Sequence, residues 1–514
     1  MKTYKLSPRT GNETIAELMR REKIDIDFPC GGNHTCGKCK VSVFGCLSEI
    51  SPSEAKFLSQ EEINSGIRLA CFAKAYGEVT IQIKDDGECK IASDGTGALD
   101  SSAPMMQKNC LGAAIDIGTT TVVCKLYNGC GEELGAKGEL NAQKSYGADV
   151  ISRINYGIHN GNEALHNAIT EQIERMLDSL AAEASAEREK ITHAVVTGNT
   201  TMLHFFAGLD PRGIGFAPFV AKSLFGNEYH DILKNVTVYI PPCISAYVGA
   251  DLVCCVLASD MCSKDEMSLI VDIGTNGEMA LTDGGKIICC STAAGPAFEG
   301  AGISHGMVAA AGAISHVFFD AEKEDLNCEI IGNGSAAGIC GSGVLDAMAV
   351  LSEQKIIMRS GRLTSDAESP LADLLDEDET KFTFPGTCVS VTQEDVRQVQ
   401  LAKGAIKAGA LTLLEYCGCS AEELAVLYLC GGFGSFLTPS SAETVGLIPD
   451  GTSEKTVVMG NGAVTGAAML LLDKTNIDKI SGIVASSRYV ELSGNDIFME
   501  HYIDSMAFSG EEEE

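Results

Sequence analysis

The chain has few basic side chains for its length. Its 514 residues include 38 lysines and arginines against 70 aspartates and glutamates, giving a net charge of −32 at pH 7. Such a surface repels phosphate backbones and anionic lipids, so we expect no nucleic-acid or membrane partner. No run of 18 uninterrupted apolar residues occurs, and the nearest candidate, Val457–Leu472, is broken by glycines and too short to span a bilayer. The final Glu511–Glu514 run is typical of a solvated acidic tail.

Several chemical signatures are also missing. The sequence has no G-x-G-x-x-G fingerprint, which argues against a dinucleotide cofactor, and no H-x-E or H-E-x-x-H zinc pattern. The 21 cysteines are an odd number and no secretory signal peptide is recognised, so we expect reduced thiols and a cytoplasmic location rather than a disulfide framework. The length exceeds what one hydrophobic core usually serves, which predicts several domains.

Four cysteines near the N-terminus follow the spacing C-x5-C-x2-C-x31-C. They are Cys30, Cys36, Cys39 and Cys71. Three thiolates on one glycine-rich loop and a fourth from a distant segment form the pattern that holds a [2Fe–2S] cluster. Gly31, Gly32 and Gly37 lack a Cβ and accept positive φ, so this loop can wrap closely around the inorganic core. The pattern therefore predicts a one-electron carrier.

Residues 1–86 resemble the β-grasp fold of [2Fe–2S] ferredoxins, an α+β class. The pattern predicts a helix at Thr14–Arg21 and strands at Lys40–Phe44 and Val79–Lys84. The five-residue spacing between the first two cysteines differs from the plant type and resembles adrenodoxin-like proteins and certain activator proteins. Residues 87–109 are rich in Gly, Ser and Ala, which predicts a flexible linker.

The remainder of the chain contains an internal repeat. Gly112–Tyr127 (GAAIDIGTTTVVCKLY) and Ser268–Leu281 (SLIVDIGTNGEMAL) are each an apolar strand, an Asp-Ile-Gly-Thr turn and a second strand. Such a repeat predicts an α/β body of two similar lobes facing each other across a cleft. We expect a first lobe at 110–265, a second at 266–480 and a C-terminal segment at 481–514.

The two turns predict a nucleotide site between the lobes. A Gly-Thr turn aims backbone N–H groups and hydroxyls at an anion, and the preceding Asp offers a hard oxygen to Mg²⁺. We therefore expect bound ATP and Mg²⁺, with Asp116 and Asp272 as catalytic carboxylates. A third element, Leu427–Phe436 (LYLCGGFGSF), lets a flat ring lie close to the backbone. The predicted nucleotide-binding residues are Gly118, Thr119, Thr120, Thr121, Gly274, Thr275, Asn276, Gly431, Gly432 and Gly434.

Other candidates are weaker. Gly338–Gly343 (GICGSG) fits either another nucleotide-side turn or the start of a helix. His193, His204 and His305 lie within or near these motifs, but a lone histidine is more often structural than catalytic.

The turns and the Gly-Gly element resemble the ASKHA superfamily of acetate and sugar kinases, heat-shock ATPases and actin. With a ferredoxin-like unit in front, the chain resembles the reductive activators of corrinoid proteins in anaerobic methyl-transfer metabolism. Ser145–Ile154 (SYGADVISRI) and Ala293–Ala301 (AAGPAFEGA) also look like that family. Some members carry an extra middle domain before the ATPase, whereas here Cys71 and Asp116 are only 45 positions apart, which leaves room for a linker alone.

The resemblance implies an ATP-hydrolysing activase that reduces a partner's Co(II) corrinoid to Co(I), with electrons passing through the [2Fe–2S] cluster. It implies two partners, a corrinoid protein of a methyltransferase system and an upstream donor such as a ferredoxin, flavodoxin or reductase. ASKHA relatives often dimerise, so a homodimer stays open.

Three other functions remain as alternatives. The first is a metabolite kinase with a redox-sensing ferredoxin domain. The second is an activator of another low-potential enzyme, such as a 2-hydroxyacyl-CoA dehydratase. Those activators hold one [4Fe–4S] cluster between two subunits, and the four-ligand loop argues against them. The third is a non-enzymatic redox scaffold, against which the paired phosphate turns argue.

Overall fold

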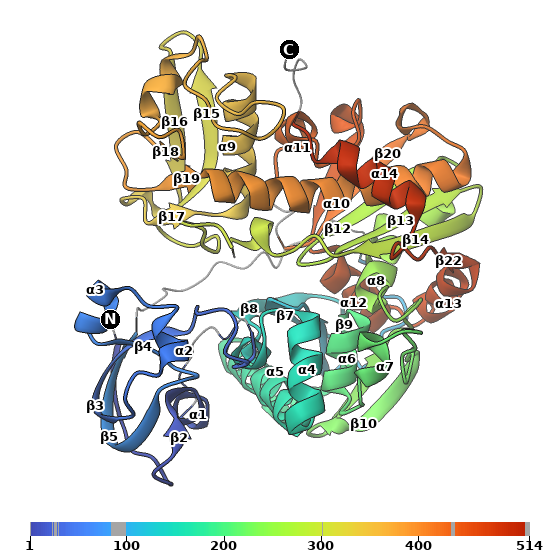
Figure 1. Ribbon diagram of the computed structural model, residues 1–514. Coiled ribbons are helices and arrows are strands. Elements are labelled where there is room, and N and C mark those ends of the chain that lie inside the picture. The colour runs from blue at the N-terminus through green and yellow to red at the C-terminus, as the bar shows by residue number, and fades with distance from the viewer. Residues whose placement is uncertain are drawn as a thin grey trace.

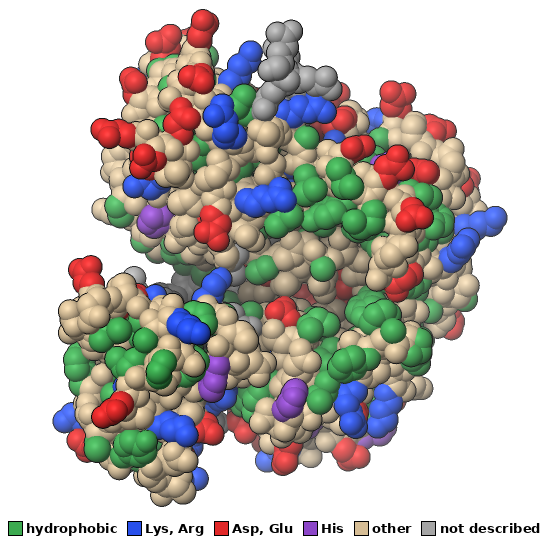
Figure 2. All heavy atoms as spheres, in the orientation of Figure 1, with side chains coloured by type: hydrophobic (Ala, Val, Ile, Leu, Met, Phe, Trp, Pro, Cys, Tyr) green, Lys and Arg blue, Asp and Glu red, His purple; other side chains and the backbone are tan. Residues whose placement is uncertain are grey.

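The computed structural model describes residues 2–22, 24, 28, 30–83, 99–300, 302–432 and 437–508. Figure 1 shows a small N-terminal unit beside a larger body made of two lobes. Within the described ranges, no helix combines the length and the apolar character needed to cross a membrane. Figure 2 shows acidic side chains spread over both lobes on this face rather than gathered in one patch.

The N-terminal unit is a five-stranded sheet covered by a helix. Its strand order is β1-β5-β3-β4, and β2 pairs with β5. The strands are β1 (Lys2–Leu6), β2 (Glu13–Thr14), β3 (Lys40–Leu47), β4 (Ile67–Leu69) and β5 (Lys74–Ile83). Helix α1 (Ile15–Arg21) starts at a capping box between Thr14 and Glu17 and buries Leu18 and Met19 against the sheet. Two short helices, α2 (Pro52–Ala55) and α3 (Gln60–Asn64), complete this ferredoxin unit.

Each lobe of the larger body is built on a six-stranded sheet. The first has the order β10-β11-β9-β6-β7-β8 and the second β21-β20-β12-β13-β14-β22. In the first lobe the strands are β6 (Leu111–Ile117), β7 (Thr121–Asn128), β8 (Glu133–Leu140), β9 (Ile191–Gly198), β10 (Asn227–Leu233) and β11 (Val236–Ile240). In the second they are β12 (Ser268–Ile273), β13 (Gly277–Asp283), β14 (Lys286–Thr292), β20 (Val426–Cys430), β21 (Thr456–Gly460) and β22 (Ser487–Tyr489).

The two sheets share one topology over five strands. In the first lobe β6, β7 and β8 form an antiparallel meander, while β9 and β11 continue the sheet in parallel on the other side of β6. In the second lobe β12, β13 and β14 form the same meander, and β20 and β21 continue in parallel. The repeat predicted from two short strings therefore extends over the core of both lobes.

Two helices cross between the lobes. Helix α8 (Ala250–Ser259) follows the first sheet and α12 (Gly462–Leu472) follows β21 of the second. They approach closely at Gly466, where an added Cβ would lie 2.2 Å from the carbonyl oxygen of Cys254. One hydrophobic core contains both helices together with Ala114 of the first lobe and Ile270 of the second. The lobes therefore share a packed hinge rather than a simple connecting segment.

The outer faces are covered mainly by helices (Figure 1). The first lobe carries α4 (Val150–Asn160), α5 (Glu163–Glu183), α6 (Thr200–Phe206) and α7 (Arg212–Gly215). The second carries α9 (Gly341–Glu353), α10 (Gln393–Cys417), α11 (Pro439–Val445), α13 (Asn476–Ser486) and α14 (Asp496–Ser505). Two small sheets complete it, formed by β15 (Ala313–Asp320), β16 (Asp325–Ile330) and β17 (Gly338–Ile339), and by β18 (Lys381–Thr383) and β19 (Ser390–Thr392).

Two expected boundaries differ from the packing. The second half of the predicted 87–109 linker lies against α12, because Met106 is buried there and the N–H of Met105 donates to the carbonyl of Leu471 at 2.9 Å. Residues 84–98 lie outside the described residues. The C-terminal segment from 481 is also part of the second lobe, since β22 extends its sheet beside β14 and α14 packs along α10.

Candidate functional site

The cysteine loop is shaped by glycines with positive φ. Gly31, Gly32 and Gly37 have φ of 62°, 90° and 65°, as the sequence predicts for a tightly wrapped loop. His34 fixes the loop to the fourth cysteine's segment, because its Nε2 lies 2.9 Å from the carbonyl oxygen of Cys71 and its ring stacks on Phe72. The local backbone therefore brings the loop and the distant segment together.

The four sulfurs gather as two pairs. The Sγ atoms of Cys39 and Cys71 are 3.3 Å apart and both residues are buried, while Cys30 and Cys36 interact with each other and are partly exposed. Contact with Cys39, together with burial and the charges of the other two cysteines, raises the pKa of Cys71. Across the described residues, no three His, Cys, Asp or Glu side chains surround a single point as one metal ion requires. Two thiolate pairs instead fit a two-iron cluster with four Cys ligands.

The two Asp-Ile-Gly-Thr turns face each other across a small cavity. Asp116 and Asp272 stand at matching places near the ends of β6 and β12, opposite Thr197 of β9 and Cys430 of β20 respectively. The crossing helix of the opposite lobe reaches each carboxylate. The side-chain amide of Asn461, which caps α12, donates to Asp116 at 3.0 Å, and the thiol of Cys255 on α8 lies 3.8 Å from Asp272.

Glu299 joins the two turns. The hydroxyls of Thr120 and Thr275 both donate to its Oε2 at 2.7 Å, and the two hydroxyl oxygens are 3.4 Å apart. The cavity around them has a volume of about 90 Å³. Pockets that hold small ligands measure roughly 300–1,000 Å³. The turns must therefore separate before a nucleotide can enter between them.

Five carboxyl groups line this cavity. They are Asp116, Asp251, Asp272, Glu278 and Glu299. Burial raises the pKa of Asp116 and of Asp272 to about 7 and that of Asp251 to about 6, because carboxylates without solvent or a cation are costly. The Oε2 atom of Glu278 is buried without a hydrogen-bond partner in the described structure. This donor set fits Mg²⁺, which usually takes one or two carboxylates together with substrate phosphates.

Most predicted nucleotide-binding residues meet at this cavity. Its lining includes Gly118, Thr119, Thr120, Thr121, Gly274, Thr275, Asn276, Gly431 and Gly432. The glycine at 431 is needed there, because its φ is 103° and an added Cβ would lie 2.3 Å from the carbonyl oxygen of Ile273. Gly434 lies outside the described residues.

Several lining residues were not predicted as site residues. Asn199, Asp251, Glu278, Glu299 and Asn461 carry polar side chains into the cavity. Asn199 and Asn461 are N-caps of α6 and α12, so an Asn directly before a helix was the available signal. Asp251 and Glu278 have no such local signal, whereas Glu299 lies within Ala293–Ala301, one of the two strings that resemble the family.

The weaker candidates lie elsewhere. Gly338–Gly343 forms β17 and the start of α9, and none of its residues lines the cavity. His204 is buried and bonded on both ring nitrogens, to the carbonyl of Thr200 and the N–H of Ser223. His193 and His305 also lie outside the cavity lining.

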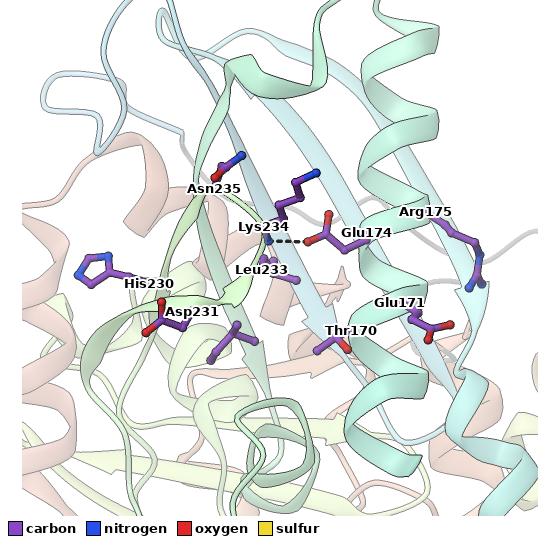
Figure 3. Close-up of a pocket in the computed structure, with 10 residues that line it drawn as sticks. Thr170, Glu171, Glu174, Arg175, His230, Asp231, Leu233, Lys234 and Asn235 are labelled. Carbon is purple, nitrogen blue, oxygen red and sulfur yellow. Dashed lines mark hydrogen bonds between the residues drawn. The ribbon is translucent and has the colours of Figure 1, made fainter. Parts of the chain in front are cut away.

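A second hollow lies on the outer face of the first lobe. Figure 3 shows it between α5 and the β10–β11 hairpin, with a volume of about 660 Å³. Glu174 accepts a hydrogen bond from the backbone N–H of Lys234 at 2.7 Å across it. None of the predicted site residues lines this hollow.

Comparisons with known proteins agree with this architecture. Residues 2–76 match a model of the 2Fe-2S iron-sulfur cluster binding domain, 111–264 the RACo middle region, and 266–514 the C-terminal ASKHA domain of RACo. The chain is 35% identical to "Corrinoid activation enzyme RamQ" of Eubacterium limosum over 427 residues, 78% of this chain and 71% of the relative. This chain belongs to the family of reductive activators of corrinoid proteins.

Further similarities support this family assignment. This chain is also 28% identical to "[Co(II) methylated amine-specific corrinoid protein] reductase" of Methanosarcina barkeri, over 77% of each chain. A solved structure named "Reductive activator for corrinoid,iron-sulfur protein" matches with a TM-score of 0.71 at 29% identity, covering 98% of this chain and 96% of that one. The expectation that this chain lacks the family's middle domain is wrong, because residues 111–264 match the RACo middle region and form the lobe that carries the first turn.

Proposed function

We propose that this activator catalyses the ATP-dependent, one-electron reduction of a partner protein's Co(II) corrinoid to Co(I). A [2Fe–2S] cluster held by Cys30, Cys36, Cys39 and Cys71 would supply the one-electron chemistry. The observation that carries the proposal is the presence, in one chain, of four cysteines gathered as two pairs on the ferredoxin unit and of two Asp-Ile-Gly-Thr turns facing each other between the lobes. Both named relatives act on corrinoid systems by their names.

ATP has a physical reason to take part. Plant-type [2Fe–2S] ferredoxins have potentials of about −400 mV. For a one-electron step each deficit of about 59 mV costs a factor of ten in the equilibrium constant. A two-lobed clamp that binds ATP differently in open and closed states can offset such a deficit by changing its affinity for the partner.

The chain's own residues then have separate tasks. Asp116 and Asp272 would hold Mg²⁺ or its waters, and the hydroxyls of Thr120 and Thr275 would hold phosphate oxygens in place of Glu299. The glycines at 431 and 432 would let the adenine ring approach the backbone. We place the reaction in the cytoplasm, with a ferredoxin, flavodoxin or reductase as upstream donor.

The test follows cobalt directly. The reduced activator is mixed with a Co(II) corrinoid protein of a methyltransferase system, and the Co(I) absorbance is recorded with and without Mg-ATP. We expect Co(I) to form only with ATP. Cys36→Ala should lose the visible cluster absorption and Co(I) formation while keeping ATP hydrolysis, which separates the two halves of the chain. Equal Co(I) formation with and without ATP, or an unchanged spectrum in Cys36→Ala, would contradict the proposal.

A further inference from the structure

The ferredoxin unit is anchored to the first lobe by one arginine. The Nε of Arg20 on α1 donates to the carbonyl oxygen of Ser145 at 2.7 Å. Its guanidinium carbon lies 4.5 Å from the ring centre of Phe28 in the ferredoxin unit, and 5.3 and 5.7 Å from those of Tyr146 and Tyr156 in the lobe. A cation between aromatic faces is a favourable arrangement across such a contact.

The cluster loop meets the same part of the lobe. A Cβ added to Gly31, the residue after Cys30, would lie 2.6 Å from the carbonyl oxygen of Tyr146. The start of the cysteine loop, beside Cys30, therefore faces the first lobe in this arrangement, while Asn33, His34 and Thr35 are exposed. A partner's corrinoid cannot approach the loop along this side while the contact persists.

The contact is loosely filled. Beside Arg20 and Ile24 a cleft of about 940 Å³ separates the ferredoxin unit from the first lobe. The Nη2 atom of Arg20 is buried without a hydrogen-bond partner among the described residues. An unsatisfied buried donor reduces the net stability of a contact. These features fit a contact that forms and separates rather than a permanent interface.

A second arginine ties this docking segment to the nucleotide cavity. Arg153, on α4, is fully buried. It donates through Nη2 to the carbonyl of Thr119 in the first turn at 2.6 Å and through Nε to the carbonyl of Gly147 at 2.9 Å. Gly147 directly follows Tyr146, so one buried side chain contacts both the first turn and the docking segment.

These contacts indicate how the docking segment would respond when a nucleotide enters the cavity. Nucleotide entry requires the two turns to separate, because Thr120 and Thr275 now share one acceptor in a cavity of about 90 Å³. Thr119, Arg153 and Gly147 all belong to the first lobe, so the response requires bound phosphate to move the first turn within that lobe. Arg153 cannot then keep both of its bonds in their present geometry.

We infer that the docked ferredoxin unit is a resting position that nucleotide binding releases, with Arg20 as its anchor and Arg153 as the positioning residue that links it to the phosphate turn. The inference rests on the proposed function, since it needs nucleotide to bind between the turns. Its consequence is that ATP frees the Cys30 end of the cysteine loop for the partner.

The test measures amide hydrogen exchange in the full, cluster-loaded chain. Peptides covering 144–148 and 30–33 are followed with and without a non-hydrolysable ATP analogue and Mg²⁺. We expect the analogue to speed exchange in both by at least about tenfold, equivalent to about 1.4 kcal/mol. Arg20→Ala should exchange rapidly without nucleotide. Its neighbour Arg21, which pairs with Glu13 inside the ferredoxin unit, supplies a matched control, and Arg21→Ala should behave like the wild type.

Arg153→Lys tests the link itself. Its charge is kept, but one ammonium cannot span both carbonyls, so the analogue should bind without speeding exchange at 144–148. Binding of the analogue, measured by titration calorimetry, separates the two proposals. If the analogue does not bind wild type, the proposed function fails. If it binds and exchange is unchanged, or if Arg20→Ala matches Arg21→Ala, the resting-position inference alone is overturned.

Discussion

Replacing Glu299 with Gln should tighten nucleotide binding. In the present arrangement the Glu299 carboxylate accepts hydrogen bonds from Thr120 and Thr275, the hydroxyls that the proposed function assigns to phosphate. ATP must therefore displace this carboxylate. The glutamine variant keeps the side-chain volume and one acceptor oxygen but removes the charge. The substitution therefore weakens the side chain that competes with phosphate for the two hydroxyls, and it does so without creating a cavity.

The size of the effect follows from the two bonds. Hydrogen bonds to charged groups contribute about 1.5–3 kcal/mol, against about 0.5–1.5 kcal/mol for neutral ones. Losing about 1 kcal/mol at each of two bonds gives about 2 kcal/mol, or roughly a thirtyfold gain in affinity. Removal of a negative charge facing a polyphosphate acts in the same direction. We expect the dissociation constant for Mg-ATP to fall by about tenfold to thirtyfold.

The assay is a titration with a fluorescent ATP analogue and Mg²⁺. An exposed glutamate on β16 supplies the control, and Glu329→Gln should bind as the wild type does. Burial raises the pKa of Glu299, so its carboxylate becomes protonated at a higher pH than an ordinary glutamate does. The affinity difference between wild type and Glu299→Gln should therefore narrow as the pH falls. An unchanged or weaker affinity in the glutamine variant would refute the reasoning, because it would make Glu299 a support for the site instead of a competitor.

Three further predictions concern the carboxylates. Asp116→Asn should reduce steady-state phosphate release by at least about a hundredfold, since Mg²⁺ contributes several kcal/mol to such reactions, while the cluster absorption stays unchanged; near-normal release would exclude its catalytic role. Burial raises the pKa of Asp116 and Asp272 from 3.8 to about 7, so between these values the native state holds more protons than the unfolded state, and the metal-free protein should lose stability as the pH rises from about 4 to 7. Each pK unit corresponds to about 1.4 kcal/mol, and a melting temperature that rises over this range would contradict the assignment. Glu54→Ala should destabilise the ferredoxin unit by about 3–5 kcal/mol, because the buried Arg68 loses its bidentate partner at 2.8 and 2.9 Å; loss of cluster absorption in denaturant measures this, and the exposed control Glu61→Ala should show no comparable loss.

The repeated turn was enough to predict two related lobes, although the strand order of their sheets was not predicted. An apolar strand, a Gly-containing turn and a second strand specify a hairpin locally, and two such hairpins specify related sheets. The strands that continue each sheet, β9 with β11 and β20 with β21, then occupy equivalent places. The cysteine loop was predictable for the same reason, because three ligands and the glycines that bend the loop are close in sequence.

Arg153 and Glu299 lie within Ser145–Ile154 and Ala293–Ala301, the two strings that resemble the family, but the sequence did not show what either side chain contacts. Glu299 and Arg153 each act through contacts between segments that lie far apart in the chain. Glu299 reaches Thr120 across 179 positions, and Arg153 reaches Thr119 across 34. The predicted linker was too long for a related reason. Small polar residues dominate the composition of 87–109, whereas Met105 and Met106 pack into the core that contains α12.

Two side chains that contact the turns do not follow the internal repeat. Two related turns present similar aspartates and similar threonines, so the repeat alone would give a symmetric cavity. Glu299 comes from the second lobe only, and Arg153 binds the first turn only. Two turns with identical surroundings would respond to nucleotide in the same way, so these two side chains make the response of the first turn differ from that of the second. Under the proposed function Glu299 is the group that nucleotide displaces. The role inferred for Arg153 is to connect that displacement to the lobe against which the ferredoxin unit is docked.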